Sequence, residues 1–186
     1  MKYIIVDLEA TCWQERKGRK NEIIEIGALC VDGHRQILGE FNQIIKPVIN
    51  PTLSDFCTEL TSITQEMVDE GYHFVESINH FLDWINSFED DYLICSWGYY
   101  DKNQFISDCE VHGMSGDWIK DQHISLKHQY AIIKSLRRPI GMKSALKSEQ
   151  MQLEGTHHRG IDDARNIAKL FIKYFEYWDS EGVRKN

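Results

Sequence analysis

The amino-acid sequence predicts an α/β fold, in which helices flank a mixed β-sheet made of an antiparallel meander plus parallel strands. Two observations carry this prediction. Residues 22–31 and 36–46 are rich in β-branched side chains and alternate between apolar and polar residues, as half-buried strands do. Further along, apolar residues recur with helical spacing on both sides of one short apolar run, which is typical of strands connected by helices.

The opening strands are expected at residues 3–8, 22–31 and 36–46. The first is almost wholly apolar until it ends in carboxylates, and the next two are rich in β-branched residues. Asp32-Gly33 stands between the second and third segments, which predicts a hairpin and completes a three-stranded meander. Pro47 and Pro51 then break the pattern into a loop.

The remaining chain is expected to add one central strand at 92–97 and a series of helices. Thr64 is a good N-cap for the first of these helices, and a broad apolar stripe marks the last. The expected helices cover residues 65–70, 77–88, 102–112, 125–136, 142–150 and 162–178.

Composition limits the class of protein. The chain has 186 residues, so we expect a single domain spanning 1–186. No apolar run approaches the roughly 20 residues that cross a membrane, and Asp7 and Glu9 interrupt the only segment that could serve as a signal peptide. Five scattered cysteines without a CxxC pair favour a reducing compartment, so we expect a cytoplasmic protein. No feature of the sequence indicates an obligatory protein partner, and we expect none. A net charge of −8 argues against a protein that coats nucleic acid.

Asp7-Leu8-Glu9, at the end of the first strand, is the first chemical signal. Side chains two residues apart on a strand share one face, so both carboxylates point into the same space. Two neighbouring buried anions repel each other and favour a divalent cation between them. The alternative is that the strand simply enters solvent at these residues.

Two further segments carry candidate groups. Asp101 follows the strand at 92–97 and could equally be a helix N-cap. His158 precedes Asp163 by five residues at the start of the final helix, which can bring an imidazole and a carboxylate to one centre. A surface or capping role is the alternative for His158, and it is the expected role of His157.

Taken together in this order, three segments resemble the DEDDh branch of the 3′–5′ exonucleases, which has an RNase H-like fold: Asp7–Cys12, Ser96–Asp101 and His158–Asp163. Three more resemble the ERI-1-like exoribonucleases, which trim RNA 3′ ends: Ile49–Cys57, Leu60–Thr64 and Asp162–Ala168. The resemblance covers nearly the whole chain. It implies a bare nuclease core whose partner is single-stranded nucleic acid, in particular an RNA 3′ end.

The resemblance also implies a site of four carboxylates that hold two Mg²⁺ ions, which Mn²⁺ could replace, with His158 as the general base. The metal ligands are Asp7, Glu9, Asp101 and Asp163. Two ions held by oxygen ligands, with a neutral histidine nearby, suit in-line hydrolysis of a phosphodiester. Asp162 competes with Asp163, but the family spacing from the histidine selects Asp163. Asp108 competes with Asp101, but it lies about two turns into the helix.

Residues that contact the substrate follow from the same resemblance. In the ERI-1-like group an aromatic residue before the second-motif Asp and the Phe of the L-S-D-F-C segment line the nucleotide pocket, which points to Tyr100 and Phe56. Thr11 and Ile63 are further candidates. The family more often has Trp in place of Tyr100, so Trp97 could contribute instead, although Trp97 and Phe56 could also be core residues. The basic run 16–20 suits either phosphate binding or a solvated hairpin tip.

The function that these residues predict is metal-dependent 3′–5′ hydrolysis of single-stranded RNA from its 3′ end. A second possibility keeps the same site but takes DNA or short oligonucleotides as substrate. A third is a regulatory binding protein built on the same fold. The presence of all four carboxylates together with His158 argues against this third possibility, because a binding protein does not need the full set.

Overall fold

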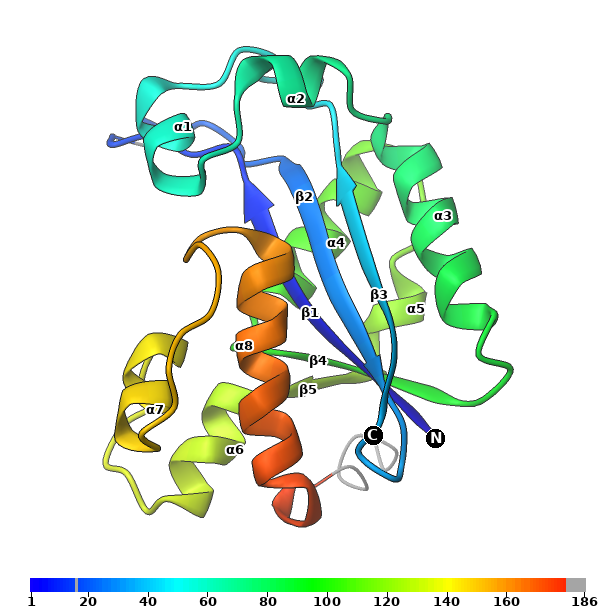
Figure 1. Ribbon diagram of the computed structural model, residues 1–186. Coiled ribbons are helices and arrows are strands. Elements are labelled where there is room, and N and C mark those ends of the chain that lie inside the picture. The colour runs from blue at the N-terminus through cyan, green and yellow to red at the C-terminus, as the bar shows by residue number, and fades with distance from the viewer. Residues whose placement is uncertain (16, 180–186) are drawn as a thin grey trace.

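The computed structural model describes residues 1–15 and 17–179 and contains a five-stranded sheet with the order β3–β2–β1–β4–β5 (Figure 1). The strands are β1 (Lys2–Ala10), β2 (Ile23–Val31), β3 (Ile37–Ile44), β4 (Tyr92–Ser96) and β5 (His123–Ser125). Neighbours among β1, β2 and β3 are antiparallel, whereas β4 pairs in parallel with both β1 and β5. The predicted mixed sheet, with its antiparallel meander, is therefore confirmed.

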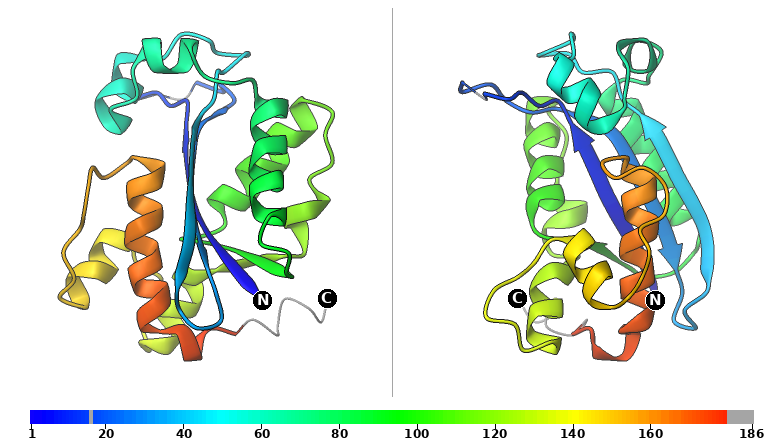
Figure 2. Two further views of the ribbon diagram at one scale, coloured as in Figure 1. Left: turned by 45° about the vertical axis from the view of Figure 1, so that its right-hand side comes forward. Right: turned by 60° about the vertical axis from the view of Figure 1, so that its left-hand side comes forward.

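Helices cover both faces of this sheet, as the edge-on view in Figure 2 shows. On one face lie α6 (Leu126–Ile133), α7 (Met142–Ser148) and α8 (Gly160–Lys173), and on the other lie α3 (Phe74–Asn86), α4 (Tyr100–Val111) and α5 (Asp117–Lys120). Two short helices, α1 (Asp55–Thr61) and α2 (Gln65–Asp69), pack near the end of β1 and the start of β2, and a 3-10 turn (Phe175–Tyr177) follows α8.

The alternation along β1 divides the core into two layers. Ile5 faces the α8 side and packs with residues of α7 and α8, such as Ala145 and Phe171. Its neighbours Ile4 and Val6 face the opposite side and belong to the cluster formed with α3 and α4. The same alternation continues to the end of β1, so it decides which layer receives Asp7 and Glu9.

Several element boundaries differ from those predicted. The hairpin forms, but Arg35 rather than Gly33 takes the left-handed conformation (φ 68°), because the Asp32 carboxylate accepts the amides of His34 and Gln36 and shapes a longer turn. The range 125–136, predicted as a helix, begins instead with the end of β5, which has only three residues and so too short a pattern to detect. Helix α1 was not predicted.

Thr64 caps α2 as predicted, accepting the Met67 amide at 3.3 Å. The final helix begins two residues earlier than predicted and ends at Lys173. Arg16, part of the basic run, lies outside the described residues. Among the residues described, no helix is both long enough and apolar enough to cross a bilayer.

Candidate active site

The carboxyl end of β1 places two acidic side chains on the face that α8 covers. Asp7 and Glu9 continue the row begun by Ile5, which packs in the α8-side core. On the adjacent strand β2, Gly27 lies opposite Asp7 and Glu25 lies opposite Glu9. The sequence thus leads an apolar row of side chains into a row of acids at one edge of the core.

A contact between two glycines brings the start of α8 directly onto this row. A Cβ at Gly27 would lie 2.1 Å from the carbonyl carbon of Gly160, and a Cβ at Gly160 would lie 3.0 Å from the carbonyl oxygen of Asp7. No side chain fits between the helix and the strands here. The close approach carries Asp163, one turn into α8, to the carboxylates of β1.

A buried ion pair holds the start of α8 in this position. Glu25 is 0% exposed, and its carboxylate accepts hydrogen bonds from the Arg159 guanidinium at 3.0 and 3.2 Å. The same carboxylate accepts the backbone amide of Gly160 at 2.8 Å. Since Arg159 directly follows His158, the Glu25–Arg159 pair fixes the segment that carries both His158 and Asp163.

Asp101 joins the cluster from the other side. Helix α4 begins at Tyr100 with Tyr99 as its N-cap, so Asp101 is not an N-cap but lies inside the first turn. Its side chain is buried, and one carboxylate oxygen accepts the backbone amide of Leu8 at 3.2 Å. This hydrogen bond draws Asp101 to the segment between Asp7 and Glu9.

The electrostatics of the cluster are those of anions that lack a counter-ion. Burial, followed by repulsion from Asp101 and Glu9, raises the pKa of Asp7 well above its usual value. Burial and the nearby charge of Asp163 raise the pKa of Glu9 to about 8. Burial likewise raises the pKa of Asp101 to about 6, although a hydrogen bond from Ser96 opposes this shift. Among the described residues, no lysine or arginine forms an ion pair with any of these three carboxylates.

Such a cluster fits divalent metal ions. Asp7, Glu9 and Asp163 each offer a carboxylate oxygen, and these atoms all lie within 4.8 Å of one another. Hard oxygen ligands of this kind suit Mg²⁺ and Mn²⁺, whose charge would compensate the repulsion that raises the pKa values of Asp7 and Glu9. The residues present therefore fit the binding of divalent cations.

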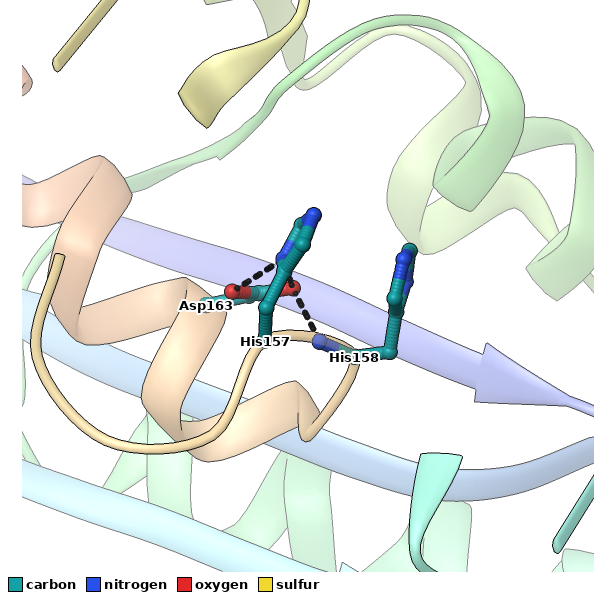
Figure 3. A group of neighbouring side chains, drawn as sticks. All are labelled: His157, His158 and Asp163. Atoms are coloured by element: carbon teal, nitrogen blue, oxygen red, sulfur yellow. Dashed lines mark hydrogen bonds and ion pairs between the residues drawn. The ribbon is translucent and has the colours of Figure 1, made fainter. Parts of the chain in front are cut away.

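Both histidines of the final motif lie at this site (Figure 3). The ring nitrogen Nδ1 of His157 lies 2.9 Å from a carboxylate oxygen of Asp163, and the backbone amide of His158 donates to the same oxygen at 2.9 Å. The two rings stack with centroids 3.9 Å apart. His157, expected to be a surface residue, is thus in contact with a candidate metal ligand. His158 adopts a left-handed backbone conformation with φ 67°.

The two competing aspartates have structural roles elsewhere. The Asp162 carboxylate accepts the Thr156 amide at 2.8 Å and pairs with Arg165, which fixes the loop before α8. Asp108 accepts the Ile23 amide at 2.7 Å, which ties α4 to the start of β2. These contacts occupy both carboxylates away from the cluster.

An open cleft of about 320 Å³ covers the cluster. It is lined by the acids, both histidines, Trp97, Tyr100 and Met142. Phe56 lies instead in a neighbouring hollow of about 440 Å³ that it shares with Trp13 and Arg19, and it is 38% exposed. The side chains of Thr11 and Ile63 are buried, and Ile63 belongs to the small core beneath α1 and α2.

Comparison with known proteins agrees with this geometry. The exonuclease family model RNase T matches residues 4–171, which include all the carboxylates of the cluster and both histidines. The chain belongs to the RNase T exonuclease family. The structure and the family match together confirm the RNase H-like fold and the resemblance to DEDDh-type enzymes.

Among individual relatives, ERI1 exoribonuclease 2 of Xenopus laevis is 32% identical over 188 residues, covering 90% of this chain and 27% of the relative. The 3′-5′ exoribonuclease 1 of Mus musculus is 29% identical over 180 residues, covering 92% of this chain and 52% of the relative. This exonuclease chain therefore spans about a quarter to a half of the length of these relatives. The crystal structure of the nuclease domain of 3′hExo, a DEDDh family member bound to rAMP, superposes with a TM-score of 0.89 at 27% identity, covering 94% of this chain and 92% of that one.

Two residues of the site were missed by reasoning from the sequence. Glu25 carried a signal, because it is a charged residue inside a strand whose other members are almost all apolar. Arg159 lies within the third motif, but nothing local indicated that its partner is a strand residue more than a hundred positions earlier. The exonuclease family match places neither residue in a role, so their positioning function rests on the ion pair itself.

Proposed function

We propose that this chain of the exonuclease family is a metal-dependent 3′–5′ exoribonuclease that removes nucleotides from the 3′ end of single-stranded RNA. The observation that carries the proposal is the convergence of Asp7, Glu9, Asp101 and Asp163 with His158 around one cleft. The exoribonuclease relatives and the RNA-nucleotide complex of 3′hExo support RNA as the substrate.

Four carboxylates hold the metal ions in this proposal. Asp7 and Glu9 come from β1, Asp101 from α4 and Asp163 from α8, and we infer Mg²⁺ as the ion, with Mn²⁺ able to replace it. When bound, two such ions activate a water molecule and stabilise the leaving 3′ oxygen. The protein's part is to hold the four carboxylates in place, through the Gly27–Gly160 contact and the Glu25–Arg159 pair.

His158 is the general base. Burial of its ring and the neighbouring His157 lower the pKa of His158, which favours the neutral form that can accept a proton near pH 7. Its backbone amide is bound to Asp163, so the imidazole is held at the rim of the cleft. His157 contacts the Asp163 carboxylate and positions it, and we assign no proton transfer to His157.

The terminal nucleotide occupies the cleft over the carboxylates. Tyr100 is half exposed at the cleft and can stack on a base, and Trp97 lies beside it. Phe56 would meet the neighbouring nucleotide from its adjacent hollow. Thr11 and Ile63 remain candidates for substrate contact, but because their side chains are buried such contact would be made through the backbone or after a local shift.

The decisive experiment is an assay of the purified protein on 3′-hydroxyl RNA and DNA strands labelled at the 5′ end, with Mg²⁺, with Mn²⁺ and with EDTA. We expect one-nucleotide laddering from the 3′ end of RNA that EDTA abolishes. A ladder on the DNA strand alone would show that DNA, and not RNA, is the substrate. Internal cuts at the outset would contradict the exonuclease proposal. So would a protein that binds the strand without cleaving it and whose strand binding is the same after Asp163→Asn.

A cytoplasmic location completes the proposal. All five cysteines are free thiols, and four of them are buried in the core. Unpaired thiols of this kind are typical of proteins in reducing compartments.

A further inference from the structure

The basic residues of this acidic chain are unevenly distributed. Although the net charge is −8, residues 122–148 contain no Asp or Glu. The same stretch contains Lys127, Lys134, Arg137, Arg138, Lys143 and Lys147. It covers the end of the sheet, α6, the loop that follows α6, and α7. One side of the molecule therefore carries a concentration of positive charge.

Most of these cations form no ion pair with the residues that the structure describes. Lys134 is engaged, because it pairs with Glu149 and donates to the Tyr174 hydroxyl. Arg137, Arg138, Lys143 and Lys147 are exposed, and none of them forms an ion pair with a carboxylate of the described chain. We call these four residues the basic arm.

Several other cations of the fold are engaged with acids. Arg165 pairs with both Glu40 and Asp162, and Lys169 pairs with Glu154. Arg35 likewise pairs with Glu176. The basic arm differs from these residues, and it leaves four charges available to an external anion.

The basic arm borders the active-site cleft. The Trp97 indole, which lines the cleft, donates to the Ile140 carbonyl at 3.0 Å and so anchors the loop between α6 and α7 to the cleft wall. Met142, the first residue of α7, also lines the cleft, and its neighbour Lys143 is close enough to His158 to lower the pKa of that histidine. In Figure 1, α7 lies beside the segment that leads into α8.

A second hollow lies along α7. It has a volume of about 370 Å³ and is lined by Lys143, Lys147, Leu146, Gln150, Met151, Gln152 and Leu153. Lys143 lines this hollow and directly follows Met142, which lines the cleft, and Lys147 lies one turn further on. Apolar side chains with lysines at the rim are suited to bases and phosphates of a flexible strand.

We propose that the basic arm binds the phosphates of the single strand upstream of its 3′-terminal nucleotide. This inference rests on the proposed exonuclease function. The cleft volume of about 320 Å³ has room for little more than one nucleotide, so the remainder of the strand must run over the surface. The basic arm is the surface beside the cleft whose charge complements that of the strand.

The basic run on the opposite side of the site is a weaker candidate for the same role. There, Lys17 pairs with Glu15 at 3.1 Å, and the guanidinium of Arg19 lies over the Trp13 ring at 5.1 Å. These cations already have partners within their own segment. A strand that followed this side instead would pass the hollow that contains Phe56.

The test compares two variants that each lose four positive charges. The arm variant carries Arg137→Gln, Arg138→Gln, Lys143→Gln and Lys147→Gln, and the control carries Lys2→Gln, Arg35→Gln, Lys46→Gln and Lys120→Gln. KM is measured for a 12-nucleotide RNA and for a dinucleotide, with Mg²⁺, over a range of salt. Circular dichroism checks that both variants are folded.

We expect the ratio of KM for the 12-mer to KM for the dinucleotide to rise at least fivefold in the arm variant. The dependence of log KM on log salt should flatten by about 2–3, since each phosphate contact on a single strand contributes about 0.7 to the slope. The control should keep the wild-type ratio and slope. The proposal would be overturned if the KM ratio of the arm variant were unchanged, or if it rose equally in the arm variant and in the control.

A binding measurement separates this proposal from the proposed activity. Fluorescence anisotropy of a labelled 12-mer with Ca²⁺ in place of Mg²⁺ reports strand binding without requiring turnover. If no strand were cleaved by any form of the protein, the exonuclease proposal would fail, whereas the arm proposal would still be decided by the affinity of the arm variant. Displacement of the 12-mer by polyglutamate at equal charge concentration would identify an acidic protein as the partner and overturn the proposal of a nucleic acid.

Discussion

Two acidic sites on the α8 side of the sheet, the single carboxylate of Glu149 and the cluster at the end of β1, differ in how their charge is compensated. Glu149 lies at the end of α7, where Lys134, Lys173 and the Tyr130 hydroxyl all contact its carboxylate. Burial alone would raise the pKa of Glu149, but hydrogen bonds from Lys173 and its other partners outweigh burial and hold that pKa well below its usual range.

The cluster at the end of β1 shows the opposite behaviour. Burial raises the pKa values of Asp7, Glu9 and Asp101, and no ion pair with a described lysine or arginine opposes this effect. The Arg159 guanidinium lies close enough to Glu9 for their charges to interact, but it is bound to Glu25 instead. The difference indicates that the fold supplies cations where a carboxylate serves stability, and omits them where an external cation is required.

Removal of a carboxylate from the uncompensated cluster should have the largest effect on activity. We expect Asp7→Ala and Asp163→Ala each to abolish turnover, because each removes a ligand on which the metal ions depend. The metal-free stability of Asp7→Ala should hold or rise, since repulsion between carboxylates is relieved. Steady-state kinetics at saturating Mg²⁺ and thermal denaturation in EDTA measure the two effects. Residual activity above about a tenth of wild type, a deficit below roughly 1.4 kcal/mol, would contradict the metal assignment.

The histidine beside the cluster should give the next largest effect. His158→Ala should lower kcat by roughly 10²–10⁴-fold, the usual contribution of a positioned general base. The lowered pKa of His158 means that the wild-type rate should rise with pH as the ring loses its proton and level off at or below neutrality. That rising limb should be lost in the variant, while Mg²⁺ affinity changes little.

His157→Ala separates the two stacked rings. Because His157 contacts Asp163, its loss should shift the Mg²⁺ dependence and leave the rising pH limb in place. His34→Ala, in the exposed hairpin turn, serves as the control that changes neither property. If His157→Ala removed the pH limb and His158→Ala kept it, the base would be His157, and the alignment with the family motif would be displaced by one residue.

Neutral replacement of one glutamate from each group tests the comparison through stability. Glu149→Gln should lower the free energy of unfolding by on the order of 2 kcal/mol, because it weakens charged hydrogen bonds to two lysines. Glu9→Gln should raise the metal-free stability, since it removes a charge that the fold does not compensate. Urea denaturation in EDTA measures both changes. Equal destabilisation by the two variants would show that the cluster is compensated after all.

A pH dependence of stability, of opposite sign at the two sites, is also expected. The folded-state pKa of Glu9 is raised from about 4.5 to about 8, so metal-free protein should lose stability as pH rises through that window. The lowered pKa of Glu149 contributes stability that is present above pH 4.5 and is lost only as pH falls below it. Mg²⁺ should flatten the loss between pH 4.5 and 8, as denaturation with and without EDTA would show. A loss of stability that Mg²⁺ does not reduce would have another origin.

Much of the fold followed from local patterns. The apolar run of the first strand, the period-two alternation along the second and third strands and the hairpin signal between those two predicted the meander. Thr64 identified the start of α2 because its cap is also a local feature, which depends only on the next three residues. Strand β5 and helix α1 escaped because each is too short for a period to be counted.

The site divides in the same way. By itself the sequence predicted which residues carry the chemistry, because Asp7 and Glu9 share one face of a strand and the three motif segments appear in a recognisable order. Only the tertiary structure decided how they meet. The glycine contact between β2 and α8 and the Glu25–Arg159 pair depend on how the start of α8 packs on the sheet. Contacts between segments more than a hundred residues apart leave no periodic signal in either segment, so packing alone determines them.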